Sequence, residues 1–411
     1  MKGRGKVFVW GMVLTLVFTL LATQSIVFGF TDPVRIGTIF PRSGFLADLG
    51  IESWRGAEIA RLERNEKGGI KGQKVIYVDT DAPNVDAAVS NAESLINREK
   101  VKVICGTYWS SGGYAASAVA EKNKTLYFEF TSVSDELTQR GFKYLLRTAM
   151  LTSGMGGAIV DFIVDSAKSG KIGVKLQDLK VAVIHEDSLM GTSISQFIMD
   201  DCKKKGLNVV HYEAYSAKAT DLSPLVLKLK DKQTDILISA CYLTDAILLS
   251  RQMKELGLKV KAQFGSSGGH GLLDFVNAVK EDAIGVYVTV FPYYGMNRKY
   301  TPGIENFETR YFKTFKEKPH AGHSVVCYMG AKVLFDSIEK AGKMDPLAIR
   351  QAAMTIDIPL GGTEAGWGVK FDPETGQNTR SPAVLFMWQK DLTLGAVYPP
   401  GAAITEGVFR K

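Results

Sequence analysis

The segments that decide the fold are VRIGTI at residues 34–39, SWRGAEIARLERNE at 53–66 and KVIYVD at 74–79. The first and third are short and rich in β-branched residues, which is typical of strands, and the longer middle segment is amphipathic, which is typical of helices. The alternation continues with a predicted helix at 86–98 and predicted strands at 101–106 and 125–130. Repeated strand–helix units predict a parallel sheet covered by helices on both faces.

The same alternation restarts after Met150, which indicates a second sheet. Strands are predicted at 181–185, 209–215, 235–240 and 262–265, and helices at 193–205, 221–230 and 245–256. A chain of 411 residues exceeds what one compact core usually serves, so the two series predict two α/β lobes.

The last part of the chain breaks this rhythm. Two or three successive helices are predicted within 305–316, 323–341 and 345–355, followed by a hairpin-like pairing of 369–372 with 383–389. This late return to helices suggests that the chain crosses back between the lobes. We therefore expect two doubly wound lobes with parallel-sheet cores joined by a three-segment hinge, the first formed by residues 31–148 and 291–360 and the second by 149–290 and 361–411.

Residues 1–30 have the pattern of a secretory signal peptide. Three of the first six residues are basic, and the apolar stretch 7–22 is shorter than the roughly 20 residues that a membrane span needs. We expect cleavage after Gly29, with an uncleaved membrane anchor as the alternative. The first cysteine is Cys105, so we expect no lipid attachment and a freely diffusing protein in the periplasm of a double-membrane bacterium.

Charge and cysteine content argue against several classes of protein. The formal net charge is +7, of which three charges lie in the predicted signal peptide, leaving about +4 (7 − 3). That charge is too mild and too scattered for a nucleic-acid-binding surface. The four cysteines (Cys105, Cys202, Cys241 and Cys327) are too few for a disulfide framework, and none has C-x-x-C spacing. We therefore expect no metal and no cofactor.

The segments that follow predicted strands are candidates for a binding site, because ligands of open α/β sheets bind beyond the carboxyl ends of the strands. They are rich in hydroxyl, glycine and aromatic residues and comprise 106–113, 131–135, 186–191, 241–245 and 265–271. Such loops and the helix N-termini after them offer backbone N–H groups to an anion. Ordinary helix capping by Ser and Thr is the alternative interpretation of each segment.

Several motifs in fixed order extend this interpretation. They are IG at 36–37, PRSG at 41–44, NEKGGIKG at 65–72, GTYWSSG at 106–112 and DELTQRG at 135–141. A cluster of this order and spacing is far more specific than a lone glycine motif. From about residue 34 to its end, the chain resembles the type I periplasmic binding proteins of branched-chain amino-acid ABC importers, the leucine/isoleucine/valine-binding group.

This resemblance implies a monomeric clamshell whose hinged lobes close on a small ligand and deliver it to an ABC permease in the cytoplasmic membrane, without catalysis. It implies that Ser110 binds the ligand carboxylate and that Thr131 and Ser132 supply backbone groups to it. The candidate ligand-binding residues are Tyr108, Trp109, Ser110, Ser111, Thr131, Ser132, Val133, Met190, Tyr242, Ser267, His270 and His323. For the aromatic, methionine and histidine members, lobe packing or helix capping is the alternative role.

The sequence departs from the family at the position expected to bind an amino group. Family members that bind amino acids carry an acidic residue in the loop that here reads GSSGGH at 265–270. Burying an ammonium without an anionic partner is costly. The expected ligand is therefore either a hydrophobic amino acid, with Asp245 or another acid reaching in, or a non-amino aromatic or aliphatic acid.

Two other functional classes are weaker alternatives. An enzyme is disfavoured because G-x-S-x-G, H-E-x-x-H and phosphate-loop motifs are absent and the five histidines lack metal-ligand spacing. A ligand sensor could use the same closing motion to inform a separate signalling partner.

Overall fold

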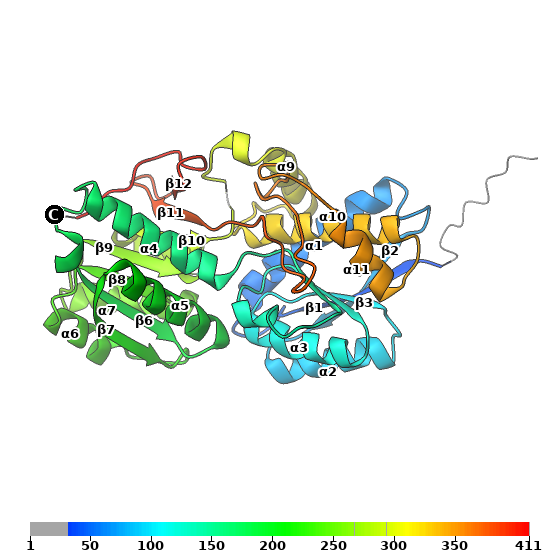
Figure 1. Cartoon of the computed structure of the whole chain (residues 1–411), viewed down its shortest axis with the longest axis horizontal. Coiled ribbons are helices and arrows are strands. Elements are labelled where there is room, and N and C mark those ends of the chain that lie inside the picture. Colours follow the sequence, from blue (N-terminus) through cyan, green and yellow to red (C-terminus); the bar gives the residue numbers. More distant parts are fainter. Residues whose placement is uncertain (1–31, 267, 293, 411) are drawn as a thin grey trace, which may run out of the picture.

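The computed structural model describes residues 32–410 except 267 and 293, and it shows two α/β lobes side by side (Figure 1). The predicted signal peptide and the candidate Ser267 lie outside the described residues. The two-lobed α/β architecture predicted from the strand–helix alternation is confirmed.

The first lobe is built on a five-stranded sheet with the order β2-β1-β3-β4-β5, all parallel. Its strands are β1 (Val34–Phe40), β2 (Val75–Asp81), β3 (Val103–Gly106), β4 (Leu126–Glu129) and β5 (Leu145–Arg147). The helices that follow the first three strands are α1 (Ala47–Glu66), α2 (Val85–Asn97) and α3 (Ser110–Lys122). Because the order reverses at β1, the crevice for a ligand lies at the carboxyl ends of β1 and β3.

Three later helices also pack on the first lobe, α9 (Ile304–Phe315), α10 (His323–Ala341) and α11 (Pro346–Met354) (Figure 1). The contact between α1 and α10 is close because Gly56 has no side chain. A Cβ atom at Gly56 would lie 1.9 Å from the carbonyl oxygen of Ser324. The close contact holds the start of α10 beside the crevice.

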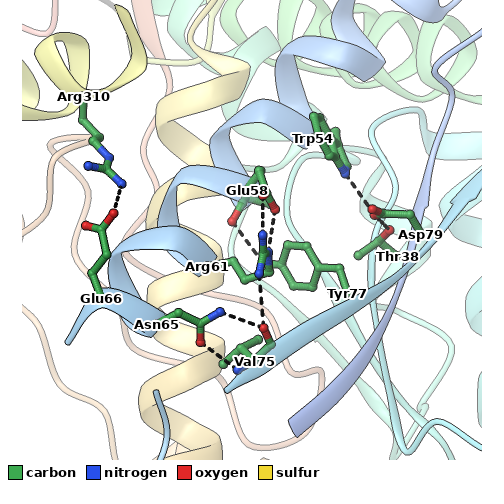
Figure 2. Close-up of polar contacts among 11 residues, drawn as sticks. Thr38, Trp54, Glu58, Arg61, Asn65, Glu66, Val75, Tyr77, Asp79 and Arg310 are labelled. Carbon is green, nitrogen blue, oxygen red and sulfur yellow. Dashed lines mark hydrogen bonds and ion pairs between the residues drawn. The ribbon is translucent and has the colours of Figure 1, made fainter. Parts of the chain in front are cut away.

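The NEKGGIKG motif covers the end of α1 and the turn towards β2, and Figure 2 shows its Asn65 beside Val75. The Asn65 amide donates to the carbonyl oxygen of Val75 at 2.9 Å and accepts from the Val75 N–H at 2.8 Å. Gly69 has a φ of +75°, and a Cβ atom there would lie 2.0 Å from the carbonyl oxygen of Gln73. Only glycine suits that conformation and approach. The motif therefore positions β2.

The second lobe contains a seven-stranded sheet with the order β12-β11-β10-β9-β8-β6-β7. Its parallel strands are β6 (Lys180–Glu186), β7 (Asn208–Tyr215), β8 (Ile236–Ala240), β9 (Ala262–Ser266) and β10 (Val286–Val290). Its helices are α4 (Thr152–Lys168), α5 (Leu189–Lys205), α6 (Ser223–Asp231), α7 (Leu243–Glu255) and α8 (Leu273–Val279). The parallel part repeats the order of the first sheet, so a second crevice lies at the carboxyl ends of β6 and β8.

The predicted hairpin is wrong in its pairing. The observed antiparallel pair is β11 (Val384–Trp388) with β12 (Leu394–Tyr398), and β11 also pairs with β10. Residues 369–372 form isolated bridges to Ile358 and Asn378 instead. The segment 369–372 has the composition of a strand, but its hydrogen-bond partners lie in neighbouring loops.

The segment after α11 stays on the first lobe beyond the predicted return at residue 361. The backbone N–H of Arg147 donates to the carbonyl oxygen of Gly376 at 2.9 Å, and that of Asn378 donates to the Arg147 carbonyl oxygen at 2.8 Å. These bonds extend β5 by a short bridge. We therefore propose that the third crossing lies between Asn378 and β11.

Two further observations concern the cysteines and the hydrophobicity of the described helices. All four cysteines are free and buried, and Cys105 in β3 is fully buried. Over residues 32–410, with the two internal gaps, no helix has the length and hydrophobicity needed to cross a membrane.

Candidate ligand-binding site

A small cavity lies between the lobes, beyond the carboxyl ends of strands from both sheets. It is lined by candidate residues from loops far apart in the sequence and by residues that were not predicted, namely Met150, Met155, Val290 and Phe291. Its described lining consists of Tyr108, Trp109, Ser110, Thr131, Val133, Met150, Met155, Met190, Tyr242, Val290, Phe291 and His323. A largely apolar, concave lining with a few polar groups is typical of small-molecule sites.

Ser110 is the polar anchor of the first-lobe wall. It is the first residue of α3, which follows β3 directly, and it is only 2% exposed. Its Oγ accepts the Ser134 backbone N–H at 3.2 Å, so the hydroxyl proton is available to a further acceptor. The first N–H groups of a helix have no acceptor within the helix and favour negative charge. This end of the cavity therefore suits an anion.

The expected role of Thr131 and Ser132 in ligand binding is not supported. The buried Glu129 carboxylate accepts the backbone N–H groups of both residues at 3.0 Å. It also accepts the N–H of Thr107 at 2.8 Å and the Thr107 hydroxyl at 2.9 Å. Burial raises the pKa of Glu129, against the opposing effect of these donors. The two N–H groups assigned to the ligand thus hold an internal carboxylate, although Thr131 still lines the cavity.

Three ring side chains form one side of the cavity. They are Tyr108, Phe291 and His323, and His323 is the first residue of α10. The His323 ring lies edge-on to Tyr108, with centroids 5.4 Å apart, and to Phe291, with centroids 4.7 Å apart. Burial lowers the pKa of His323 to about 3, so its imidazole is neutral at pH 7. Its Nδ1 is buried and has no hydrogen-bond partner among the described residues.

The second-lobe wall is formed mainly by flexible and aromatic apolar side chains. Met190 comes from the start of α5, Tyr242 caps α7, and Phe291 follows β10. Met150 and Met155 come from the crossing into α4 and from α4 itself. Methionine adapts its shape to irregular partners, so this wall suits a hydrophobic body.

The lobes touch around the cavity, and most of its lining is buried. The Ser193 hydroxyl on α5 donates to the Glu136 carboxylate at 2.9 Å. The rings of Phe45 and Tyr242 meet edge-on with centroids 5.8 Å apart. These contacts connect opposite lobes, so the structure is closed and ligand access requires the lobes to separate.

The structure does not bring His270 into the cavity. His270 is fully buried within the second lobe, where its Nδ1 lies 3.3 Å from the Cys241 Sγ and its Nε2 lies 3.0 Å from the Gln263 amide nitrogen. Gly265 leaves room for the imidazole, since a Cβ there would lie 2.6 Å from the ring. Ser111 and Ser132 are likewise absent from the described lining.

Of the described residues that line the cavity, none is acidic, and the one basic residue, His323, is uncharged at pH 7. Glu186 is buried and precedes Met190 by four residues. Its carboxylate accepts the Ser188 N–H, the Ser188 hydroxyl and the Gly191 N–H. Asp245 accepts the Tyr215 hydroxyl at 2.7 Å, and burial raises its pKa to about 7. Within residues 32–410 apart from the two gaps, no group of three or more His, Cys, Asp or Glu side chains is arranged to hold a metal ion.

Gly112 leaves room for the Trp109 indole because it has no side chain. A Cβ atom on Gly112 would lie 2.2 Å from the Trp109 ring. We expect Gly112→Ala to displace the indole and lower the free energy of unfolding by about 1–3 kcal/mol, measured by urea denaturation. Gly154→Ala in α4 is the control, because open space surrounds that position. Equal effects of the two substitutions would contradict the expected collision.

Comparisons with known proteins fit this geometry. A family model described as "Periplasmic binding protein" matches residues 33–392. The chain belongs to the periplasmic binding protein family. The Leu/Ile/Val-binding protein homolog 7 of Brucella suis biovar 1 (strain 1330) is 38% identical to this binding protein over 374 residues, which cover 91% of the chain and 93% of the relative. The predicted membership of the Leu/Ile/Val-binding-like group is confirmed.

Two solved structures share the fold of this binding protein. The branched-chain amino acid transporter substrate binding protein LivJ of Streptococcus pneumoniae, in complex with isoleucine, matches with a TM-score of 0.75 at 21% identity and covers 90% of this chain and 100% of that one. A solute binding protein of an ABC transporter from Rhodopseudomonas palustris BisB5, in complex with 3,4-dihydroxy benzoic acid, matches with a TM-score of 0.73 at 21% identity and covers 92% and 98%. The predicted two-lobed clamshell fold is therefore confirmed.

Proposed function

We propose that this binding protein is the extracytoplasmic component of an ABC importer. It catches a small carboxylate between its lobes and delivers it to a permease in the cytoplasmic membrane. In this proposal the protein acts in the periplasm as a monomer after signal-peptide removal, and it catalyses no reaction. The solute-binding family and the relatives named as ABC-transporter proteins support the assignment.

The observation that carries the proposal is the shared cavity, which has Ser110 and the N-terminus of α3 on one wall and Met190 and Tyr242 on the other. A ligand that touches both walls stabilises the closed arrangement through contacts that the open arrangement lacks. Ligand binding and lobe closure are thereby linked. Such a linkage is what a permease needs in order to distinguish loaded from empty binding protein.

Thermal unfolding with a panel of small acids tests the proposed function. We expect at least one carboxylate to stabilise the protein, because a ligand at about a hundredfold excess over its Kd adds about 2.7 kcal/mol to the free energy of unfolding. Its methyl ester is the control and should stabilise much less, since it lacks the anion. Equal stabilisation by acid and ester would contradict a carboxylate site.

A further inference from the structure

We infer that the ligand is an aromatic carboxylic acid that carries an uncharged polar substituent and no ammonium group. This inference rests on the proposed function and narrows it to one class of substrate. It follows from the charges near the cavity, from the shape and chemistry of its lining, and from one histidine nitrogen without a partner.

No acidic residue of the described lining can pair with an ammonium group on the ligand. The described lining holds no acid, and the two undescribed internal positions, Ser267 and Tyr293, add none from the sequence. Glu129 and Glu186 do not line the cavity, and several N–H and O–H donors already occupy their carboxylates. An ammonium group buried here would lose its hydration without gaining an anionic partner.

Asp245 and Asp48 are the other two acidic residues near the cavity, and neither is part of its lining. Asp245 is 1% exposed, is absent from the lining and accepts the Tyr215 hydroxyl, although its other oxygen has no partner among the described residues. Asp48 lines a second cavity, which adjoins the first at Tyr108 and Tyr242, and it lies 3.2 Å from the imidazole of His320. Neither carboxylate lines the cavity beside Ser110, where an amino acid would present its ammonium next to its carboxylate.

The lining favours a flat, hydrophobic body. Aromatic rings and methionine side chains make up most of the wall, and both pack well against an aromatic ring.

His323 provides the reason for a second polar group on the ligand. Its ring is fixed between Tyr108 and Phe291, and its buried Nδ1 lacks a partner among the described residues. Buried polar atoms in native proteins nearly always have a hydrogen-bond partner, and a ligand can supply it. Because the imidazole is neutral, a hydroxyl or similar uncharged group matches it better than an ion does.

Calorimetry with matched pairs of acids tests the absence of an ammonium site. Leucine and isocaproate differ only in the ammonium group, as do tyrosine and desaminotyrosine. We expect desaminotyrosine to bind at least about tenfold more tightly than tyrosine, and isocaproate more tightly than leucine. Tighter binding of leucine or tyrosine would overturn this inference and leave the carboxylate function standing. If none of the four acids binds, the proposed function falls together with the inference.

A substitution at His323 tests the second polar group. Hydrocinnamate is desaminotyrosine without its hydroxyl, and the unsubstituted protein should bind desaminotyrosine more tightly than hydrocinnamate. We expect His323→Phe, which keeps a ring between Tyr108 and Phe291, to remove most of that preference, whereas His323→Gln should retain part of it. If His323→Phe weakens both acids equally, the histidine does not contact the hydroxyl and this part of the inference is wrong. A thermal melt of each variant checks that it is folded.

Discussion

Replacing Ser110 with alanine is expected to weaken binding of the carboxylate ligand by about 1–3 kcal/mol, or about 5- to 150-fold in Kd. The hydroxyl lines the cavity and accepts the Ser134 N–H, which leaves its proton free for the ligand anion. Hydrogen bonds to charged groups are the stronger ones, so the upper half of this range applies if the contact is direct. Isothermal calorimetry with the tightest acid of the panel measures the change.

The neighbouring serine offers a matched control for this substitution. Ser111 is the next residue of α3, but it is partly exposed and does not line the cavity. We expect Ser111→Ala to leave the Kd within about twofold of the unsubstituted value, because surface changes are generally worth about 0.5 kcal/mol or less. An unchanged Kd for Ser110→Ala would rule out the assigned contact.

Replacing Arg147 with methionine is expected to lower the free energy of unfolding by about 3 kcal/mol or more, because each buried polar group left without a partner costs about 1–3 kcal/mol. The guanidinium is fully buried at the end of β5 and donates to four oxygens. These belong to Gln377 at 2.6 Å, Ser134 at 2.6 Å, Thr138 at 3.1 Å and Ser132 at 3.2 Å. Burial lowers the pKa of Arg147 to about 10, so the group remains protonated at neutral pH. Methionine would leave the buried oxygens without donors.

Urea denaturation of Arg147→Met beside Arg35→Met provides the measurement and its control. Arg35 pairs with Glu99 on the surface, where both side chains are nearly half exposed, and such pairs contribute about 1 kcal/mol or less. Arg147→Lys should not restore stability, because one ammonium cannot reach the separated acceptors that the planar guanidinium serves. Similar losses of unfolding free energy for Arg147→Met and Arg35→Met would show that the buried arginine does not stabilise the segment 132–138 that it contacts.

Much of the fold could be predicted because its strands are apolar, short and bounded by clear breaks. The prediction missed α3, whose beginning, SSGG, has low helix propensity. Tertiary contacts stabilise this helix, since Gly112 and Gly113 lie against Trp109 and the Glu129 side chain. The pairing of β11 with β12 was missed because the pattern of one segment does not identify its partner.

Ser110 and Tyr242 were chosen as candidates because they lie just beyond predicted strands, and both line the cavity between the lobes. His270 was placed wrongly because a short 3-10 helix turns its side chain into the core, and only the neighbouring Gly265 gave a signal for that space. Glu129 was not singled out, although a lone acid in the apolar run LYFEF is unusual for a buried strand. Its role depends on the fold, which brings donors of Thr107, Phe130, Thr131 and Ser132 to one carboxylate.

The closed cavity has a consequence for the timing of ligand exchange. Most of the described lining is nearly inaccessible to solvent, and opposite lobes touch through Glu136 with Ser193 and through Phe45 with Tyr242. Under the proposed function, a captured molecule cannot depart until these contacts break, whatever its own affinity. Dissociation rates of dissimilar ligands then share one ceiling, which the protein sets through the frequency of its opening. A permease that pulls the lobes apart would raise this upper limit on the dissociation rate and so would control when the ligand is released.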